Sequence, residues 1–268
     1  MEKLNDIKLV LADLDGTLLH EDKSLDRDIK EVRTALLDKG IEFSFASGRN
    51  MHIMQDMVKE LAISLPYITN NGANMFVGKD CVYECSILSL ELKQTIHILL
   101  AKGIPFIAYS NFVVYPHGSH PGLTTFLQRL IGKSEIKELE DMNEVYGQSI
   151  FKIVLIHENE SLMREIMQEI NTTCSATHCV RSEGDVYTVT HQSASKGNAV
   201  HRLLEQTGIH PSQVIVFGDN YNDTSMFDVV AHSVVMGNAK KEIQNKAEFV
   251  TKSNDEDGVS WFLRNYVL

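Results

Sequence analysis

The chain has 268 residues, of which 43% are hydrophobic and 23% are charged, and its formal net charge is −11 at pH 7. A chain of this length can bury a large core and form one or two domains. Because nucleic-acid backbones and anionic membranes repel an acidic surface, neither is expected as a partner, and an anionic ligand would need a local positive site. No apolar stretch reaches the roughly 18 residues of a membrane-spanning helix, and residues 1–8 are too polar for a signal peptide, so a cytoplasmic location is predicted.

Strands and helices alternate along the first 70 residues. Ser24 suits the N-cap of the first helix, whose apolar residues recur at helical spacing, and Gly40 suits its C-terminal stop. A βαβαβ order is therefore predicted, with strands at 7–12, 41–46 and 67–69 and helices after Ser24 and at 51–61.

The C-terminal part repeats this alternation, with a helix at 196–206, a strand at 214–217, a helix near 224–230 and a strand at 233–236. Between the two ends the rhythm changes to runs of strands with two longer helices, after a hairpin across 78–80. The sequence therefore predicts an α/β fold: a doubly wound parallel-sheet core formed by 1–81 and 191–268, with an inserted α+β cap domain at 82–190.

The segment Asp13-Leu14-Asp15-Gly16-Thr17 follows the first apolar run directly. The carboxyl ends of parallel strands are where open α/β sheets bind ligands. Asp13 and Asp15 can direct a carboxylate and a backbone carbonyl at one hard cation, and one carboxylate then remains for acid–base work. The alternative is an Asp-Gly turn that only ends the strand.

A second acidic cluster, Gly218-Asp219-Asn220-Tyr221-Asn222-Asp223, also follows a short apolar strand. Like charges gathered at one sheet edge repel each other, and a bound divalent cation would make such a cluster tolerable. The candidate ligands are hard oxygen atoms without sulfur or imidazole, which favours Mg²⁺.

Donors for an anion come from two further segments. Ser47-Gly48-Arg49 lies between a strand and a helix, so the Ser47 hydroxyl and backbone N–H groups at the helix start can hold an anion, although a plain N-cap is at least as good an interpretation. Lys196 opens a helix and offers a positive charge for a phosphoryl group. Taken alone, such a lysine is most often a solvated surface residue.

The four cysteines lie in two loose pairs, at 81 and 85 and at 174 and 179, with His178 beside the second pair. Their spacings do not match a usual zinc finger or ribbon, so reduced thiols are the better interpretation and zinc the alternative.

In these segments the chain resembles the haloacid dehalogenase-like hydrolases, and more narrowly the Cof-type phosphatases with a large α/β cap. The four motifs of that family are matched in order by Asp13 to Leu18, Ser47 to Arg49, Lys196-Gly197 and Gly218 to Asp223. The segments 71–73, 236–239 and 254–259 look Cof-like as well, so the resemblance covers essentially the whole chain.

The resemblance implies a role for each of these residues. Asp13 would be the nucleophile and would form an aspartyl-phosphate. Asp15 would be the acid and later the base, a role in which it contributes most if its pKa lies nearer neutrality, as is expected for it here. Mg²⁺ would be held by Asp13, Asp15 through its carbonyl, and Asp219. The phosphate would be bound by Ser47, Gly48, Lys196 and Asn222, with Asp223 in support.

The substrate implied by the resemblance is a small phosphorylated metabolite, and a sugar phosphate is the hypothesis. The cap would exclude water and choose the substrate. A sugar-phosphate mutase and a phosphate-ligand sensor without turnover remain as alternatives, although the intact pair Asp13 and Asp15 argues against the sensor.

Overall fold

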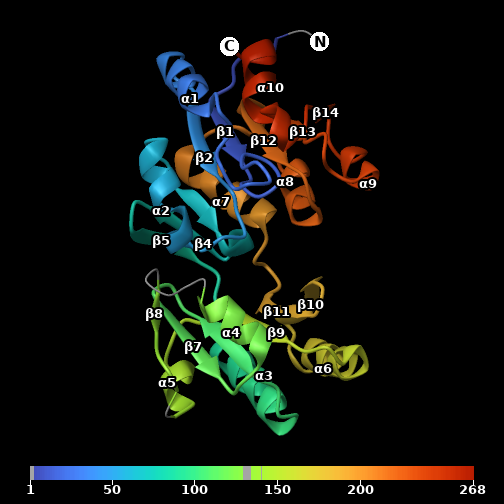
Figure 1. Cartoon of the computed structure of the whole chain (residues 1–268). Coiled ribbons are helices and arrows are strands. Elements are labelled where there is room, and N and C mark those ends of the chain that lie inside the picture. Colours follow the sequence, from blue (N-terminus) through green and yellow to red (C-terminus); the bar gives the residue numbers. More distant parts are fainter. Residues whose placement is uncertain (1–2, 129–133, 140) are drawn as a thin grey trace. The chain divides into compact units, whose positions relative to one another are not determined.

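The computed structural model describes residues 3–128, 134–139 and 141–268. The chain divides into two compact units: unit 1 comprises Met1–Tyr83 and Ser195–Leu268, and unit 2 comprises Glu84–Ala194 (Figure 1). The divisions lie slightly beyond the expected boundaries at residues 81 and 190, because strands β5 (Asp80–Glu84) and β11 (Val186–His191) continue across those positions.

Over its described residues, unit 1 is built around a five-stranded parallel sheet, which confirms the predicted α/β class. The sheet order is β14 (Phe249–Val250), β13 (His232–Val235), β12 (Val214–Gly218), β1 (Leu9–Ala12) and β2 (Glu42–Phe45). The central strands β1 and β12 are buried throughout, as expected for continuous apolar runs covered on both faces.

Helices cover both faces of this sheet. Alternate residues of β1 point to opposite faces, so Val10 packs with helices α1 (Ile29–Asp38), α2 (Met51–Glu60) and α10 (Gly258–Tyr266). Leu9 and Leu11 pack instead with α7 (Lys196–Thr207) and α8 (Thr224–Phe227). The short helix α9 (Lys241–Gln244) adds Ile243 to that second cluster.

One local prediction in unit 1 is wrong, and one predicted strand lies in a different sheet. Helix α1 begins at Ile29 after Asp28, not at Ser24, because the Ser24 hydroxyl donates to the Asp22 carboxylate and the chain turns again before the helix. The predicted third strand is confirmed as β3 (Tyr67–Thr69), and a parallel bridge between Ala46 and Ile68 and a hydrogen bond from the Ser47 N–H to the Ile68 carbonyl join it to the end of β2. It pairs with β4 (Asn74–Val77), which precedes β5 in a separate three-stranded sheet.

Unit 2 holds, in its described residues, a six-stranded mixed sheet with helices. The order is β10 (Thr177–Glu183), β11, β9 (Lys152–Ile156), β6 (Phe106–Tyr109), β7 (Val113–His117) and β8 (Glu135–Ile136). Helices α3 (Ser89–Ala101) and α6 (Glu160–Thr173) pack on one face of the sheet. Helices α4 (Pro121–Gln128) and α5 (Asn143–Tyr146) and strands β7 and β8 were not predicted, because they are short and carry little periodicity.

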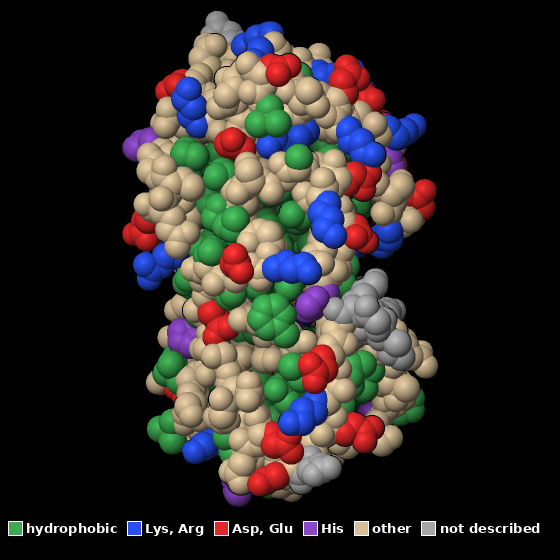
Figure 2. Space-filling view, turned by 90° about the vertical axis from the view of Figure 1, so that its left-hand side faces the viewer, with side chains coloured by type: hydrophobic (Ala, Val, Ile, Leu, Met, Phe, Trp, Pro, Cys, Tyr) green, Lys and Arg blue, Asp and Glu red, His purple; other side chains and the backbone are tan. Residues whose placement is uncertain are grey.

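The surface carries both acidic and basic side chains, as expected from a sequence with 36 acidic and 25 basic residues (Figure 2). On the face drawn in Figure 2, acidic and basic side chains are interspersed, and no broad basic surface gathers there. None of the helices in the described part of the chain is long and apolar enough to cross a membrane.

Candidate active site

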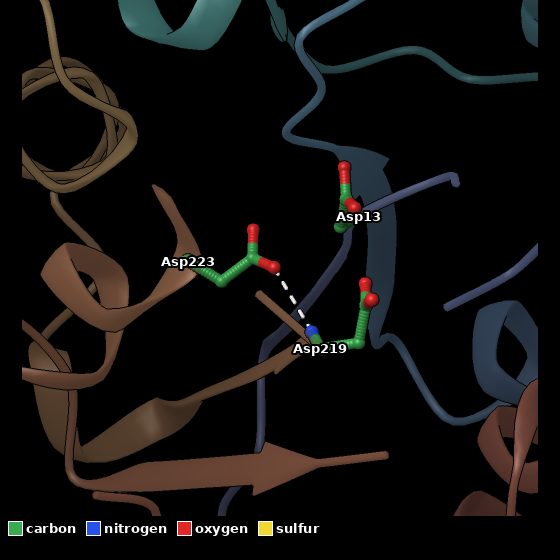
Figure 3. A group of neighbouring side chains, drawn as sticks. All are labelled: Asp13, Asp219 and Asp223. Carbon is green, nitrogen blue, oxygen red and sulfur yellow. Dashed lines mark hydrogen bonds between the residues drawn. The ribbon is translucent and has the colours of Figure 1, made fainter. Parts of the chain in front are cut away.

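The carboxylates of the two acidic motifs meet at one edge of the unit 1 sheet. Asp13 follows β1 and Asp219 follows β12, and these strands are parallel neighbours with Ala12 opposite Phe217. One carboxylate oxygen each from Asp13, Asp219 and Asp223 lies within 4.8 Å of the others. Figure 3 shows the three side chains gathered where the strands end. The edge predicted from the strand order is therefore the place where the acidic groups converge.

Lys196 is buried between two of these carboxylates. Its Nζ lies 2.7 Å from Oδ1 of Asp13 and 2.6 Å from Oδ1 of Asp223. Ser195 caps helix α7 by accepting from the N–H of Asn198, which fixes Lys196 at the first turn. Burial alone would lower the pKa of Lys196, but the two carboxylates raise it, so the ammonium stays charged. Lys196 is thus a buried lysine paired with two carboxylates and not a solvated surface residue.

Asp223 organises the loop after β12. While its Oδ1 accepts from Lys196, its Oδ2 accepts at 2.9 Å from the backbone N–H groups of both Asp219 and Asn220, the first of which is the dashed line in Figure 3. Asp223 is completely buried. Since both oxygens already accept hydrogen bonds, its carboxylate mainly orients Lys196 and the Asp219 backbone.

Asp219 is held by the first motif. Thr17, which was not predicted as a site residue, donates from its hydroxyl to Oδ1 of Asp219 at 2.9 Å. Gly16 has φ +76°, and a Cβ on it would lie 2.5 Å from Oδ2 of Asp219. Glycine is therefore required for two reasons, its left-handed backbone and the close approach of the carboxylate.

Burial and the charge of Asp223 raise the pKa values of Asp13 and Asp219. Burial raises the pKa of Asp13 to about 7; the charge of Lys196 opposes this shift, and that of Asp223 adds to it. Burial, followed by the charge of Asp223, raises the pKa of Asp219 to about 6. A second positive charge beside Lys196 would lower both pKa values and so favour the ionised forms of Asp13 and Asp219.

Asp15 does not join the carboxylate cluster with its side chain. Its oxygens accept two hydrogen bonds of 2.7 Å from the Arg49 guanidinium and one of 3.1 Å from Lys23. Burial would raise the pKa of Asp15, but the bonds and charges of Arg49 and Lys23 outweigh it and lower the pKa. The expectation of a pKa nearer neutrality for Asp15 is therefore wrong, because two cations face this carboxylate.

The second motif lies close to the fourth. Ser47 is buried and its hydroxyl accepts from the Arg49 N–H at 3.1 Å. A Cβ on Gly48 would lie 2.9 Å from Oδ1 of Asn71, and Asn222 donates to that same oxygen at 2.9 Å. Asn71 therefore links Gly48 to Asn222.

Asn71 has a left-handed backbone with φ 56° and was not singled out as a site residue. Only its place in a Cof-like segment could have indicated it. The predicted start of the second helix at Met51 is confirmed, whereas the alternative of a plain N-cap at Ser47 is wrong. Helix α2 begins at Met51 with Asn50 as its N-cap, so Ser47 and Gly48 lie in the loop before the helix and not at its first turn.

Comparisons with known proteins show the family to which the chain is similar. A family model described as haloacid dehalogenase-like hydrolase matches residues 10–263. A 5-amino-6-(5-phospho-D-ribitylamino)uracil phosphatase from Bacillus subtilis is 26% identical, and the alignment covers 96% of this chain and 97% of that protein. A relative from Haemophilus influenzae is 30% identical over 96% of this chain and 97% of its own length.

Solved structures show the same fold. TM0651 from Thermotoga maritima superposes with a TM-score of 0.87 at 23% identity and covers 98% of each chain. The subclass IIB sugar phosphatase BT4131 superposes with a TM-score of 0.80 at 24% identity over 97% of this chain and 98% of its own. At 23% and 24% identity, these two structures show that the fold is shared.

Proposed function

This chain belongs to the haloacid dehalogenase-like hydrolase family and is a phosphatase, and we propose that it is Mg²⁺-dependent and hydrolyses a small phosphorylated metabolite through an aspartyl-phosphate on Asp13. The observation that carries the proposal is the environment of Asp13. One of its oxygens is bound by the buried Lys196, and no described residue donates a hydrogen bond to the other. A carboxylate held by one oxygen at a ligand-binding sheet edge is suited to attack with the second.

The residues present fit a hard divalent cation. Asp13 and Asp219 offer carboxylate oxygens whose pKa values are raised first by burial and further by the charge of Asp223. Asp223, whose oxygens both accept hydrogen bonds, would support them. These are oxygen ligands of the kind that Mg²⁺ takes in phosphoryl-transfer sites. Bound there, Mg²⁺ would supply positive charge that favours the ionised carboxylates and offsets the charge of a phosphate.

In the proposed reaction, Oδ2 of Asp13 attacks the phosphorus of the ester. The Oδ2–P bond forms as the bond from phosphorus to the leaving oxygen breaks, and Asp15 gives its proton to that oxygen. Water then attacks the aspartyl-phosphate, Asp15 takes the proton of the water, and inorganic phosphate leaves with Asp13 restored. Lys196 would stabilise the charge on the phosphoryl group throughout.

The proton transfer by Asp15 requires a rearrangement. Arg49 and Lys23 hold this carboxylate in the ionised form in the present structure. For Asp15 to carry a proton to a leaving oxygen, these contacts must loosen when substrate binds. Arg49 directly follows the phosphate-binding loop, so a phosphate bound there could compete with Asp15 for the guanidinium.

Phosphate binding is assigned to Ser47, Gly48, Lys196 and Asn222, and Asn71 is added because it bridges Gly48 and Asn222. The Ser47 hydroxyl still has a hydrogen to donate, since it acts only as an acceptor toward Arg49. The assignment is supported by the contacts of Gly48 in the second motif and Asn222 in the fourth motif with the same residue, Asn71.

A sugar phosphate or related phosphorylated polyol is the proposed substrate class. The two Bacillus subtilis relatives named 5-amino-6-(5-phospho-D-ribitylamino)uracil phosphatases act, by their names, on a phosphorylated ribityl group. BT4131 is named a sugar phosphatase. We assign the choice among such substrates to unit 2, the predicted cap, and propose that the protein works in the cytoplasm.

The test is Mg²⁺-dependent release of inorganic phosphate from a panel of sugar phosphates, nucleotides and phosphorylated cofactors. Asp13→Asn should abolish release, and EDTA should do the same to the parent protein. Activity only on nucleotides or cofactors would remove the sugar-phosphate assignment. Conversion of a sugar phosphate to its isomer without net release would identify a mutase, and binding without either reaction would identify a sensor.

A further inference from the structure

Residues 236–239, one of the Cof-like segments, directly follow β13 and bond to both loops that carry the acidic motifs (β12 and β13 in Figure 1). The Met236 N–H donates at 3.0 Å to the carbonyl of Gly218, the residue before the first aspartate of the fourth motif. The Asn238 side chain donates from Nδ2 at 2.8 Å to the carbonyl of Gly16, the residue after the second aspartate of the first motif. The segment therefore joins the two loops beside their carboxylates.

The amide of Asn238 is oriented by its two partners. Its Oδ1 accepts at 3.0 Å from the backbone N–H of Asn254, and its Nδ2 donates to Gly16. Since a backbone N–H can only donate and a carbonyl can only accept, these partners fix which end of the amide faces which loop. Behind the turn, Gln244 donates from Nε2 at 3.1 Å to the carbonyls of the residues directly before and after Asn238. The side chain is thus held in place although it is exposed.

Asn254 extends the bridge to a second point of the first motif. It begins the short 3-10 helix Asn254–Glu256 in the other C-terminal Cof-like segment. Its side chain is buried and donates from Nδ2 at 2.9 Å to the carbonyl of Leu19. Asn238 and Asn254 together therefore hold the loop after β1 at Gly16 and at Leu19.

Gly16 lies between two residues that bear on the candidate cation site. On one side is Asp15, whose backbone carbonyl is expected to bind Mg²⁺, and on the other is Thr17, whose hydroxyl donates to Asp219 at 2.9 Å. Gly16 has φ +76°, and the backbone of a glycine is less restricted than that of any other residue. No other described residue donates a hydrogen bond to its carbonyl. The bond from Asn238 is therefore the restraint on this carbonyl.

The alternative is an asparagine that only closes its own turn. Asparagine in a turn commonly bonds to the backbone two residues further along the chain. Asn238 instead bonds to the backbone of two other loops, at Gly16 and Asn254. Because Asn238 is exposed, water could replace both bonds at little cost in stability, so global stability does not account for the arrangement.

We propose that Asn238 is a positioning residue for the divalent cation. Its bond to Gly16 holds the backbone between the Asp15 carbonyl and Thr17 in the geometry that the cation needs. This inference rests on the proposed function, because it takes Mg²⁺ to bind where the two acidic motifs meet. Groups that orient metal ligands typically contribute about 10- to 100-fold to metal affinity.

Calorimetric titration of the purified protein with Mg²⁺ measures the effect directly. Asn238→Ala should raise the Kd for Mg²⁺ by about 10-fold. Asn238→Leu, which nearly keeps the shape of the side chain but has neither donor nor acceptor, should do the same. In assays of phosphate release, the Mg²⁺ concentration for half-maximal activity should rise by the same factor, whereas kcat at saturating Mg²⁺ should stay close to that of the parent.

Two control variants separate positioning from a general loosening of unit 1. Asn245→Ala changes an exposed asparagine just after α9 and should leave the Kd for Mg²⁺ unchanged. Ser260→Ala removes a 2.6 Å hydrogen bond to Asp26, which also joins the loop after β1 to the C-terminal segment but away from Gly16. Ser260→Ala should lower the urea midpoint in EDTA and should not weaken Mg²⁺ binding.

The outcomes distinguish this inference from the proposed function. Parent-like Mg²⁺ affinity in both Asn238 variants would overturn the inference even in an active phosphatase. A Ser260→Ala variant that weakens Mg²⁺ binding equally would also overturn it, because the effect would then be one of general stability. If the parent binds Mg²⁺ but releases phosphate from no ester, the proposed reaction on Asp13 fails while the titration still decides the role of Asn238. A parent that binds no Mg²⁺ would refute both the positioning role and the Mg²⁺ dependence.

Discussion

Replacing Asp219 by asparagine should make metal-free unit 1 more stable at pH 8. The pKa of Asp219 is raised from 3.8 to about 6, first by burial and then by the charge of Asp223. At about 1.36 kcal/mol per unit of pKa, the ionised carboxylate costs up to about 3 kcal/mol at pH 8. Because Asp219 is partly exposed, we expect a gain of about 1 to 3 kcal/mol. Asparagine keeps an oxygen to accept the Thr17 hydrogen bond.

The sign of the pH dependence follows from the direction of the shift. A carboxyl with a raised pKa binds its proton more tightly in the folded state, so stability falls as the pH rises from about 4 through about 6. The gain from Asp219→Asn should therefore be full at pH 8 and shrink to about one third at pH 4.5. Adding Mg²⁺ should stabilise the parent and should stabilise the variant much less.

Urea denaturation in EDTA, followed by tryptophan fluorescence, measures this effect in the right unit. The single tryptophan, Trp261, lies in α10 of unit 1, so its signal reports unfolding of the unit that holds the site. Asp228→Asn, which removes an exposed carboxylate from the same unit, is the matched control. A loss of stability at pH 8, or a gain of equal size at both pH values, would show that Asp219 is not destabilised by its surroundings.

Three further variants probe the same cluster. Asp13→Asn should abolish phosphate release while the denaturation curve still shows a cooperatively folded unit 1, and residual turnover in a purified variant would refute the nucleophile. Lys196→Met should lower the free energy of unfolding by about 3 to 5 kcal/mol at neutral pH, because it leaves Asp13 and Asp223 buried without their cation. A urea denaturation midpoint equal to that of the parent protein would contradict this prediction. Thr17→Val should cost about 1 to 2 kcal/mol in stability and weaken Mg²⁺ binding in a calorimetric titration, whereas unchanged affinity would mean that the Thr17 hydroxyl does not orient Asp219.

The sequence was most informative about acidic residues that directly follow apolar strands. Asp13 and Asp219 each follow an apolar strand, and parallel strands place their carboxyl ends at one edge, so their convergence could be predicted without any contact being known. The class of fold followed from the same alternation of strands and helices.

What the sequence missed depends on contacts across the chain. Arg49 faces Asp15 because the loops after β1 and β2 lie side by side, and Lys23 reaches Asp15 from farther along the same loop after β1. Neither cation has a sequence pattern that predicts this partner. The pairing of Lys196 with Asp223 likewise joins the start of α7 to the loop after β12. A pKa depends on such neighbours, which explains why the fold class was confirmed while the pKa expected for Asp15 was wrong.

The order in which the sheet strands occur along the chain has a consequence for synthesis of the protein. Strand β1 lies between β2, which follows it closely, and β12, which begins at Val214. A ribosome that adds about 5 to 20 residues per second needs on the order of 10 to 40 s to reach β12 after β1. During that time unit 2 can be completed while one edge of a fully apolar strand stays unpaired. Nascent chains stopped between the two strands should therefore bind chaperones, and full-length chains should release them.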